Sequence, residues 1–96
     1  MKYALKVDDK DNVVTVLSHV EKGETVSYLD NGDTKEVVAQ NEVPIYHKIA
    51  IRDIKMDEDI VKYGEHIGRA SQDIIKGSHV HTHNIKDHRE NLEEKE

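Results

Sequence analysis

The chain contains 96 residues, of which 35% are hydrophobic and 35% are charged, and its formal net charge is -6. This length fits one small domain, and the lack of Phe and Trp leaves only a thin core of aliphatic side chains and four tyrosines. The acidic balance excludes proteins that bind nucleic acid or anionic membranes through a basic surface, and the absence of cysteine excludes disulfide frameworks and thiolate chemistry.

The ends of the chain and its thin core lead to two further expectations. The segment Met1–Val7 has no apolar signal-peptide region, and no stretch is long enough to span a bilayer, so a soluble cytoplasmic protein is expected. Because a small core stabilises a lone domain only marginally, a partner chain or a homo-oligomer is expected as well.

The first third of the chain predicts β structure broken by polar turns. Tyr3–Val7 alternates as a strand does, and Asp8–Asn12 is a cluster of turn-forming residues. Val13–Val20 is rich in β-branched residues and predicts a second strand. The alternative is a short helix that Asp11 caps and that runs to Leu17.

The next stretch carries a strong hairpin signal. Thr25–Leu29 predicts a strand after a turn at Glu21–Glu24. Asp30–Asp33 contains an Asn-Gly pair, which suits a type I′ turn. We therefore expect Thr34–Ala39 to pair back onto the preceding strand.

The second half continues in the same pattern. Pro44 sets the entry to a strand predicted over His47–Ile54, and a further strand is predicted over Ile60–Tyr63. Gly64–His66 is expected to turn the chain, and Ile67–Ile75 then leads to the last apolar stretch.

The composition divides the chain into two parts. Residues 1–86 form the predicted β domain, whereas residues 87–96 are almost wholly charged. The tail is expected to be either a frayed helix or disordered, because it offers little to bury.

A short internal repeat supports a bent β architecture. The pattern apolar, any, Lys, Gly, any, any, apolar occurs at Val20–Val26 and again at Ile74–Val80. A degenerate copy at Ile54–Ile60 has Asp57 in place of the glycine. Glycine supplies a positive φ at a tight turn, so the repeat predicts several similar corners in a compact structure rather than a flat sheet.

One stretch suggests chemistry. Gly77–Asn84 contains His79, His81 and His83, spaced two residues apart. On a strand the three imidazoles would share one face at intervals of about 6.5 Å, where they could bind one metal ion, or one anion if protonated. The alternative is an ordinary solvent-facing strand surface with Val80 buried behind it.

Several segments together resemble the N-terminal domain of the altronate and galactarate dehydratases. The resemblance runs from about Lys6 to Ile85. The segments that carry it are Asp11–Val13, Lys22–Val26, His47–Ile54, Val61–Glu65, Ile67–Ala70, Asp73–Ile74, Lys76–Gly77 and His79–Asn84. The sequence departs from the family pattern at Tyr46 and Asp57, which stand where glycine is usual.

The resemblance implies a mainly β fold, a β-clip of the SAF type with short helical turns. In that family this module precedes a much larger dehydratase domain or forms a separate small subunit. The chain is therefore expected to be a small subunit beside a large catalytic dehydratase subunit, although a fragment of a longer enzyme would give the same sequence.

The resemblance also implies a cofactor and a substrate. Dehydratases of this family look metal-dependent, so a divalent ion is expected, with iron foremost and Mn, Mg or Zn as alternatives. The expected ligands are His81 and His83, joined by His79. The expected substrate is a sugar acid such as altronate or galactarate, or a sulfo-analogue such as sulfolactate.

Three further residues are candidates for binding the substrate. His47 and Lys48 could hold its carboxylate, and Arg69 could bind a carboxylate through two nitrogens. For each the alternative is an ordinary exposed side chain. The residues supply no evident catalytic acid–base set, so the isolated chain is not expected to turn over substrate.

Three functions remain open at this point. The first is the small subunit of a hydro-lyase, or of the related sulfolactate sulfo-lyase. The second is a non-catalytic binding module or lid for a partner enzyme. The third is a free metal-binding protein.

Overall fold

A computed structural model describes residues 1–86, and these residues are almost entirely β structure. The predicted charged tail, residues 87–96, lies outside the described residues. The described strands are β1 (Lys2–Leu5), β2 (Val13–Val16), β3 (Thr25–Asp30), β4 (Asp33–Val38), β5 (Lys48–Ala50), β6 (Asp59–Lys62), β7 (Glu65–Ala70), β8 (His79–Val80) and β9 (Ile85–Lys86). One 3-10 helix, η1 (Thr82–Asn84), precedes β9.

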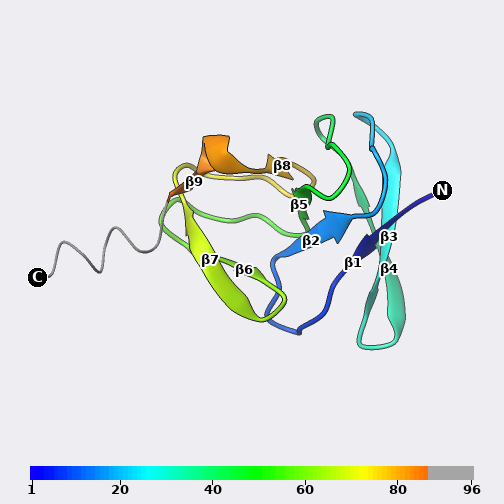
Figure 1. The fold of residues 1–96 in the computed structure, drawn as a ribbon, viewed down its shortest axis with the longest axis horizontal. Helices are drawn as coiled ribbons and strands as arrows, with labels where there is room; N and C mark the ends of the chain where they lie inside the picture. The colour runs from blue at the N-terminus through cyan, green and yellow to red at the C-terminus, as the bar shows by residue number, and fades with distance from the viewer. Residues whose placement is uncertain (87–96) are drawn as a thin grey trace, which may run out of the picture.

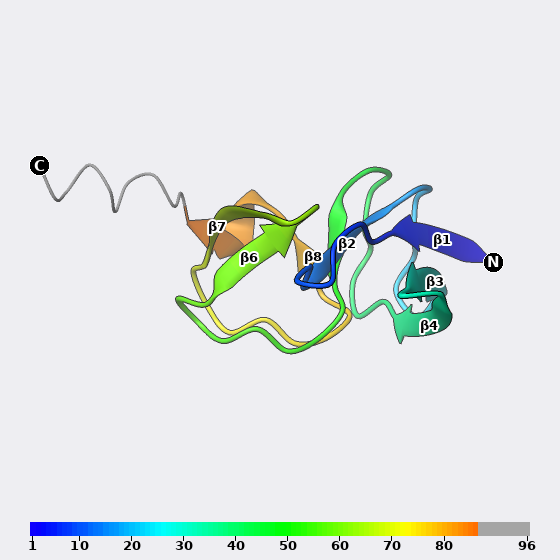
Figure 2. The same cartoon turned by 90° about the horizontal axis from the view of Figure 1, so that it is seen from below.

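The strands form two sheets. The larger has the order β4-β3-β1-β2-β5-β8, and the smaller has the order β6-β7-β9. The larger sheet contains one parallel pair, β1 with β3, and its other pairs are antiparallel. Figure 1 shows β1, β3 and β4 at one end of the molecule and β6, β7 and β9 at the other, with β2, β5 and β8 between them, and Figure 2 shows the same order from below. The prediction of a mainly β fold is confirmed.

Strands β2 and β5 lie between two hydrophobic cores. Val14, Val16 and Ile49 belong to the core under β1, β3 and β4, whereas Val13 and Ala50 belong to the core under β6 and β7. All four residues of β2 are buried, which is why three of them are valine and the strand shows no alternation; the fourth, Thr15, is a buried polar residue. Of the two predictions for this segment, the strand is confirmed, and it ends at Val16 rather than Val20.

Four similar turns form the corners of the fold. In each turn the N–H of the fourth residue donates to the carbonyl of the first, and the third residue has positive φ. The turns are Glu21–Glu24, Pro44–His47, Lys55–Glu58 and Ile75–Ser78. The repeat predicted three of these corners. The fourth, at Pro44–His47, escaped the pattern because Tyr46 occupies the position of the glycine.

Each corner is held by two backbone hydrogen bonds against a buried residue that lies in a strand or, for Ala39, directly after one. The N–H of Gly23 donates to the carbonyl of Ala39 at 2.8 Å, and the N–H of Ala39 donates to Glu24 at 2.9 Å. The other three corners repeat this exchange with Val16, Ala50 and Ala70. The corners also pair with one another through the bridges Val20↔Val43 and Ile54↔Ile74.

Tyr46 provides the first test of this corner geometry. Its φ of 68° is costly for a residue with a Cβ, and its side chain is 67% exposed, so little packing is lost on truncation. We expect Tyr46→Gly to raise the free energy of unfolding by about 1 kcal/mol. Urea denaturation measures this, and Gly23→Ala, at the equivalent position of another corner, should lower it by a similar amount. A lower free energy of unfolding in Tyr46→Gly would contradict the claim that the positive φ of Tyr46 is strained.

Two hairpin turns each contain two consecutive residues with positive φ. Asn31 and Gly32 both have positive φ, 54° and 85°, which confirms the predicted type I′ turn. Tyr63 and Gly64 also both have positive φ, 56° and 78°. The second turn therefore precedes β7, and the prediction of a turn over Gly64–His66 placed it too late, because a tyrosine in the left-handed region gives no sequence signal.

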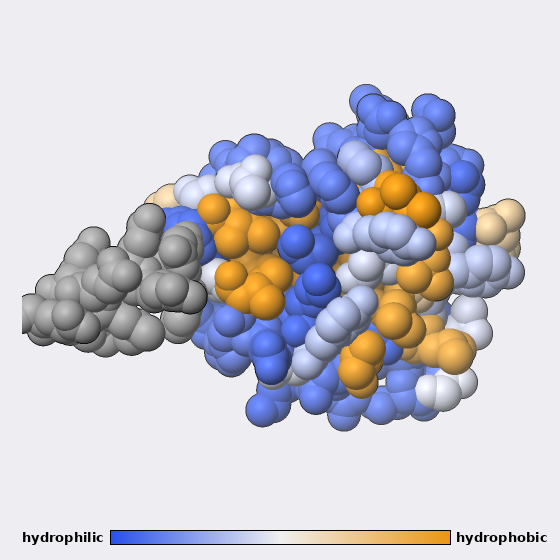
Figure 3. Space-filling view, in the orientation of Figure 1, coloured by the Kyte–Doolittle hydropathy of each residue, from blue (hydrophilic) through white to orange (hydrophobic). Residues whose placement is uncertain are grey.

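Several large apolar side chains remain exposed. Figure 3 shows two apolar areas on one face of the molecule, separated by polar surface. Alternation along β1 turns Tyr3 and Leu5 away from the core residue Ala4, and Leu29 on β3 and Leu17 after β2 are exposed nearby in the sheet. None of the helices in the described part of the chain could span a membrane.

Candidate metal centre

The histidine stretch is not the continuous strand that the alternation predicted. β8 covers only His79 and Val80, and η1 follows at once. The side chain of Asn84 causes the change: its Oδ1 accepts from the N–H of His81 at 2.9 Å, and its Nδ2 donates to the carbonyl of His79 at 3.0 Å. Because Asn84 is buried, it fixes this turn, and the prediction that three histidines share one strand face was wrong.

The sheet brings a different histidine into the group. β5 pairs antiparallel with β8, with Lys48 opposite Val80 and Ile49 opposite His79. Just before β5, His47 therefore meets His81, and their rings stack with centroids 4.0 Å apart. The Nδ1 of His47 and the Nε2 of His79 share a hydrogen bond of 2.9 Å.

His47, His79 and His81 form the candidate metal centre. One ring nitrogen from each lies within 4.8 Å of the others, a spacing at which three imidazoles can converge on one ion. All three residues are half-buried, and the Nδ1 of His81 is buried without a hydrogen-bond partner among residues 1–86. A buried nitrogen without a partner is costly in a purely structural cluster and fits a ligand atom.

His83 lies beside this group. Its ring centroid is 5.2 Å from that of His79, but the side chain is exposed and outside the group of three. Its role as a ligand stays a prediction without support from the geometry. The sequence reasoning assigned His47 to the substrate, and the structure places it instead with the ring nitrogens of His79 and His81.

The surroundings favour the neutral forms of His79 and His81. Burial lowers the pKa of His79 to about 4, and the neighbouring rings of His47, His83 and His81 and the ammonium of Lys48 add to the shift. Burial is also the first cause that lowers the pKa of His81, followed by His47 and Lys48. Because neutral imidazole binds metal and protonated imidazole binds anions, the cluster favours the metal over the anion.

The lowered pKa of His79 predicts an acid-sensitive fold. The pKa of an unfolded histidine is near its ordinary value of 6.5, and that of the folded His79 is about 4, so between these pH values the unfolded chain binds more protons. The free energy of unfolding of the metal-free protein should therefore fall as the pH drops from 6.5 to 4. Urea denaturation at several pH values measures the fall.

Variants isolate the contribution of His79 from other titrating groups. His79→Gln should lose less stability than the wild type over the same pH interval, because the titrating ring is gone. Thr82→Ala, an exposed neutral change in η1, should follow the wild type. A His79→Gln curve parallel to the wild type would contradict the shifted pKa.

Two hollows open beside the centre. One, of about 530 Å³, is lined by polar side chains that include Asn41, Asp73, His79 and His83. The other, of about 300 Å³, is lined by Lys48, Ile67, His81, Thr82 and Ile85. His79 therefore lines one space and His81 lines the other, and a ligand could enter either of them.

The residues predicted to bind the substrate do not all lie beside the histidines in the structure. Lys48 lines the hollow next to His81, as the prediction for this residue requires. Arg69 lies on β7 opposite Asp59 and Lys86 and lines neither hollow beside the histidines. A carboxylate contact by Arg69 stays a prediction that the geometry does not support.

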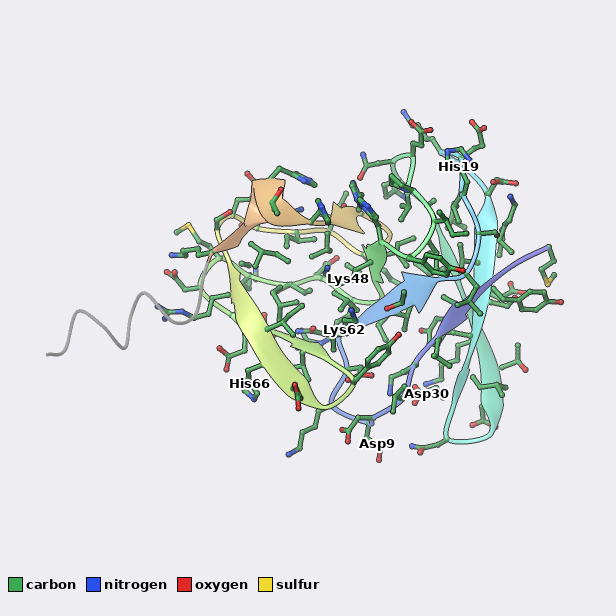
Figure 4. The ribbon with its side chains drawn as sticks, viewed as in Figure 1. Asp9, His19, Asp30, Lys48, Lys62 and His66 are labelled. Carbon is green, nitrogen blue, oxygen red and sulfur yellow. The ribbon has the colours of Figure 1, made fainter. Side chains whose placement is uncertain are left out.

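Figure 4 labels the substrate candidate Lys48 together with charged residues to which the sequence assigned no role. Lys48 and Lys62 lie near the middle of the view, and His19 and His66 lie at its edges. His19 contacts Glu42 and His66 contacts Asp59, so both have carboxylate neighbours away from the centre.

Comparison of the sequence with known protein families and proteins points to one family. A family model described as the altronate/galactarate dehydratase SAF domain matches residues 2–88. The chain is 41% identical over 87 residues to altronate dehydratase of Bacillus subtilis, covering 90% of this chain and 16% of that protein. It is 35% identical over 94 residues to altronate dehydratase of Escherichia coli, of which it covers 18%.

A second kind of relative has a similar length. The chain is 40% identical over 84 residues to (2R)-sulfolactate sulfo-lyase subunit alpha of Chromohalobacter salexigens, covering 83% of this chain and 89% of that protein. The chain thus spans less than a fifth of the altronate dehydratases and most of the sulfo-lyase subunit.

Proposed function

The chain belongs to the altronate/galactarate dehydratase SAF-domain family, and we propose that it is the small component of a lyase that acts on a hydroxy acid. Its relatives are hydro-lyases and subunits of a sulfo-lyase, so the reaction class is the elimination of water or sulfite from such an acid. The first choice is a dehydratase of altronate or galactarate, and the alternative is a sulfolactate sulfo-lyase.

The observation that carries this proposal is the group of His47, His79 and His81. Their ring nitrogens lie within 4.8 Å of one another, and two of the three rings have lowered pKa values, which keeps them able to bind metal at neutral pH. An all-imidazole set suits iron or zinc better than magnesium or manganese, which prefer oxygen ligands. We propose iron as the ion.

The residues of this chain would divide the work. The three histidines would hold a divalent ion, which would supply polarisation of a substrate oxygen and stabilisation of the charge that develops beside the carboxylate. Asn84 keeps His79 and His81 in place through its two hydrogen bonds. Lys48, next to His81, attracts the anionic group of the acid. The base that removes the proton would come from a larger lyase chain.

A larger lyase chain is the proposed partner. In the Bacillus subtilis relative the matched region is 16% of the protein, and the relative of similar length is called a subunit. The exposed side chains of Tyr3, Leu5 and Leu29 form an apolar face on β1 and β3 that such a chain could cover. Pairing of two copies through this face is the competing outcome.

A reconstitution experiment tests the function. The chain is mixed with a large dehydratase-like lyase chain from the same source, with Fe²⁺ added under anaerobic conditions, and release of water or sulfite is assayed with altronate, galactarate and sulfolactate. We expect activity only when both chains are present, and the preferred substrate decides between the two lyases. Turnover by this chain alone, or full activity of the large chain alone, would contradict the proposal.

The apolar face is tested in the same system. Leu29→Asp should weaken the complex with the large chain, whereas Val38→Asp, an exposed apolar change on the outer strand β4, should leave it intact. Analytical ultracentrifugation measures both. A wild-type dimer that Leu29→Asp dissolves, without any complex, would assign the face to a second copy instead.

A further inference from the structure

The strand β4 leaves one edge of the larger sheet unpaired. β4 is the last strand of that sheet and, within residues 1–86, pairs only with β3. Figure 1 shows it at the end of the molecule away from β6 and β7. A six-residue edge strand presents backbone groups with which another strand can pair.

The backbone groups of Thr34 and Glu36 point outwards from this edge. Along an antiparallel pair, residues that exchange two hydrogen bonds alternate with residues that exchange none. The two-residue type I′ turn is closed by a hydrogen-bonded pair, Asp30 with Asp33, so the odd-numbered residues of β4 bond to β3. Ala39, which follows β4, continues this alternation by exchanging backbone bonds with the corner beside it. The N–H and C=O groups of Thr34 and Glu36 therefore have no partner strand within residues 1–86.

The charges at this edge are unbalanced within the chain. Asp33 pairs with Asp30 across the hairpin, so two carboxylates stand opposite each other. Lys6 and Lys35 lie 3.0 and 2.9 Å from carboxylate oxygens of Asp30. Among residues 1–86 no cationic side chain lies within 4.0 Å of the carboxylate of Asp33. A cation from another chain would reduce the repulsion between the two carboxylates.

The charges also select one register for pairing with a second copy. Two copies that pair antiparallel through the same strand are related by a twofold axis, so one residue of β4 faces itself. If that residue were Asp33, Lys35 or Glu36, two like charges would stand opposite each other, which is unfavourable. If it is Thr34, each Asp33 stands opposite the Lys35 of the second copy, and the outward groups of the two Thr34 residues meet. Glu36 then lies opposite Gly32, around which there is open space.

The far end of β4 is closed by a corner of the same chain. The N–H of Gln40 donates to the carbonyl of Gly77 at 2.8 Å. A Cβ added to Gly77 would lie 2.2 Å from the carbonyl oxygen of Val38, so the corner packs directly against the edge. Registers centred on Val37 or Val38 are therefore blocked, and Thr34 is the one residue of β4 left for the centre.

We propose that two copies of this chain pair antiparallel through β4, centred on Thr34, with an ion pair between Asp33 and Lys35 on each side of the twofold axis. The contact is small, so the dimer is weak and forms at high protein concentration. This inference goes beyond the proposed function and does not depend on it. The histidines lie by β8, the opposite edge of the same sheet, and stay open. Because the axis is perpendicular to the sheet, the apolar faces of the two copies lie on one side.

A single introduced cysteine tests the register. The chain has no cysteine, so any disulfide in a one-cysteine variant joins two copies. In the proposed register the two Cα atoms of Thr34 lie about 5.5 Å apart, which a disulfide can span, whereas those of Glu36 lie more than about 13 Å apart. We expect Thr34→Cys to cross-link in glutathione buffer at least about tenfold faster than Glu36→Cys, the control on the same face of β4. Equal rates would overturn the proposal.

Charge changes test the ion pairs in solution. Asp33→Lys and Lys35→Glu each place like charges opposite each other, so each variant alone should stay monomeric at concentrations where the wild type dimerises in sedimentation velocity. An equimolar mixture of the two variants restores opposite charges on both sides of the axis and should dimerise. Glu65→Lys, an equal change of charge at an exposed position of β7, should dimerise as the wild type does. Urea denaturation checks that each variant is folded.

Three other results would also overturn the pairing of two copies. The first is a wild-type chain that stays monomeric at every concentration, and the second is a dimer that neither charge change weakens. The third is an edge that pairs with a strand of the large lyase chain: Asp33→Lys would then weaken that complex, and no dimer of this chain would form. Each of these results would leave the histidine centre untouched, because metal binding and activity are measured separately.

Discussion

His81→Ala should abolish specific binding of a divalent metal by this chain. His81 offers a buried Nδ1 without a hydrogen-bond partner, and its ring stacks on His47 with centroids 4.0 Å apart. Removing a ligand should cost more than the roughly 10- to 100-fold in affinity that follows loss of an outer-shell partner. Isothermal titration with Zn²⁺ and with Fe²⁺ under anaerobic conditions measures the loss.

The matched variants separate ligands from neighbouring histidines. His47→Ala and His79→Ala should behave like His81→Ala, because the three nitrogens form one group. His66→Ala, an exposed histidine on β7, should bind metal as the wild type does. His83→Ala should lose little, since its ring lies outside the group. Equal loss in the His83 and His81 variants would restore the original prediction of alternate histidines.

Asn12→Ala should destabilise the fold more than any exposed substitution. Asn12 is 1% exposed, its Nδ2 donates to the carbonyl of Asp59 at 2.8 Å, and its Oδ1 accepts from the N–H of Val61 at 2.8 Å. These bonds join the start of β2 to β6, and so join the two sheets. Alanine removes the partner of the buried N–H of Val61 and of the part-buried carbonyl of Asp59, so we expect a loss of about 3 kcal/mol in the free energy of unfolding.

Denaturation in urea measures this loss. Gln72→Ala removes an exposed amide near a corner and should change the free energy of unfolding by less than about 0.5 kcal/mol. An Asn12→Ala protein as stable as Gln72→Ala would show that the seam between the sheets does not depend on this side chain.

The predictable part of the fold is local. The repeat at Val20–Val26 and Ile74–Val80 predicted similar corners because glycine marks a positive φ, and the Asn31-Gly32 pair predicted its hairpin for the same reason. Tyr46 in a corner and Tyr63 in a hairpin turn also have positive φ, but tyrosine carries no such signal. The sequence therefore predicted the turns in which glycine has positive φ. It missed or misplaced the turns in which the tertiary structure imposes a positive φ on tyrosine.

The candidate centre was only half visible in the sequence. His79 and His81 stood out by their spacing, but His47 joins them through the pairing of β5 with β8, 32 residues apart between His47 and His79. Register between distant strands cannot be derived from alternation alone. The turn that withdraws His83 depends on Asn84, whose buried amide bonds to two backbone groups of β8 and the residue after it. A polar residue at that position looked like the end of a strand.

The most direct measurement of the central claim is X-ray absorption spectroscopy of the chain loaded with one equivalent of Fe²⁺ or Zn²⁺. The arrangement of His47, His79 and His81 predicts a first shell with three imidazole nitrogens at about 2.0–2.1 Å, as zinc shows with histidine, completed by oxygen ligands. A shell of oxygens alone, or one imidazole at most, would contradict the proposed centre.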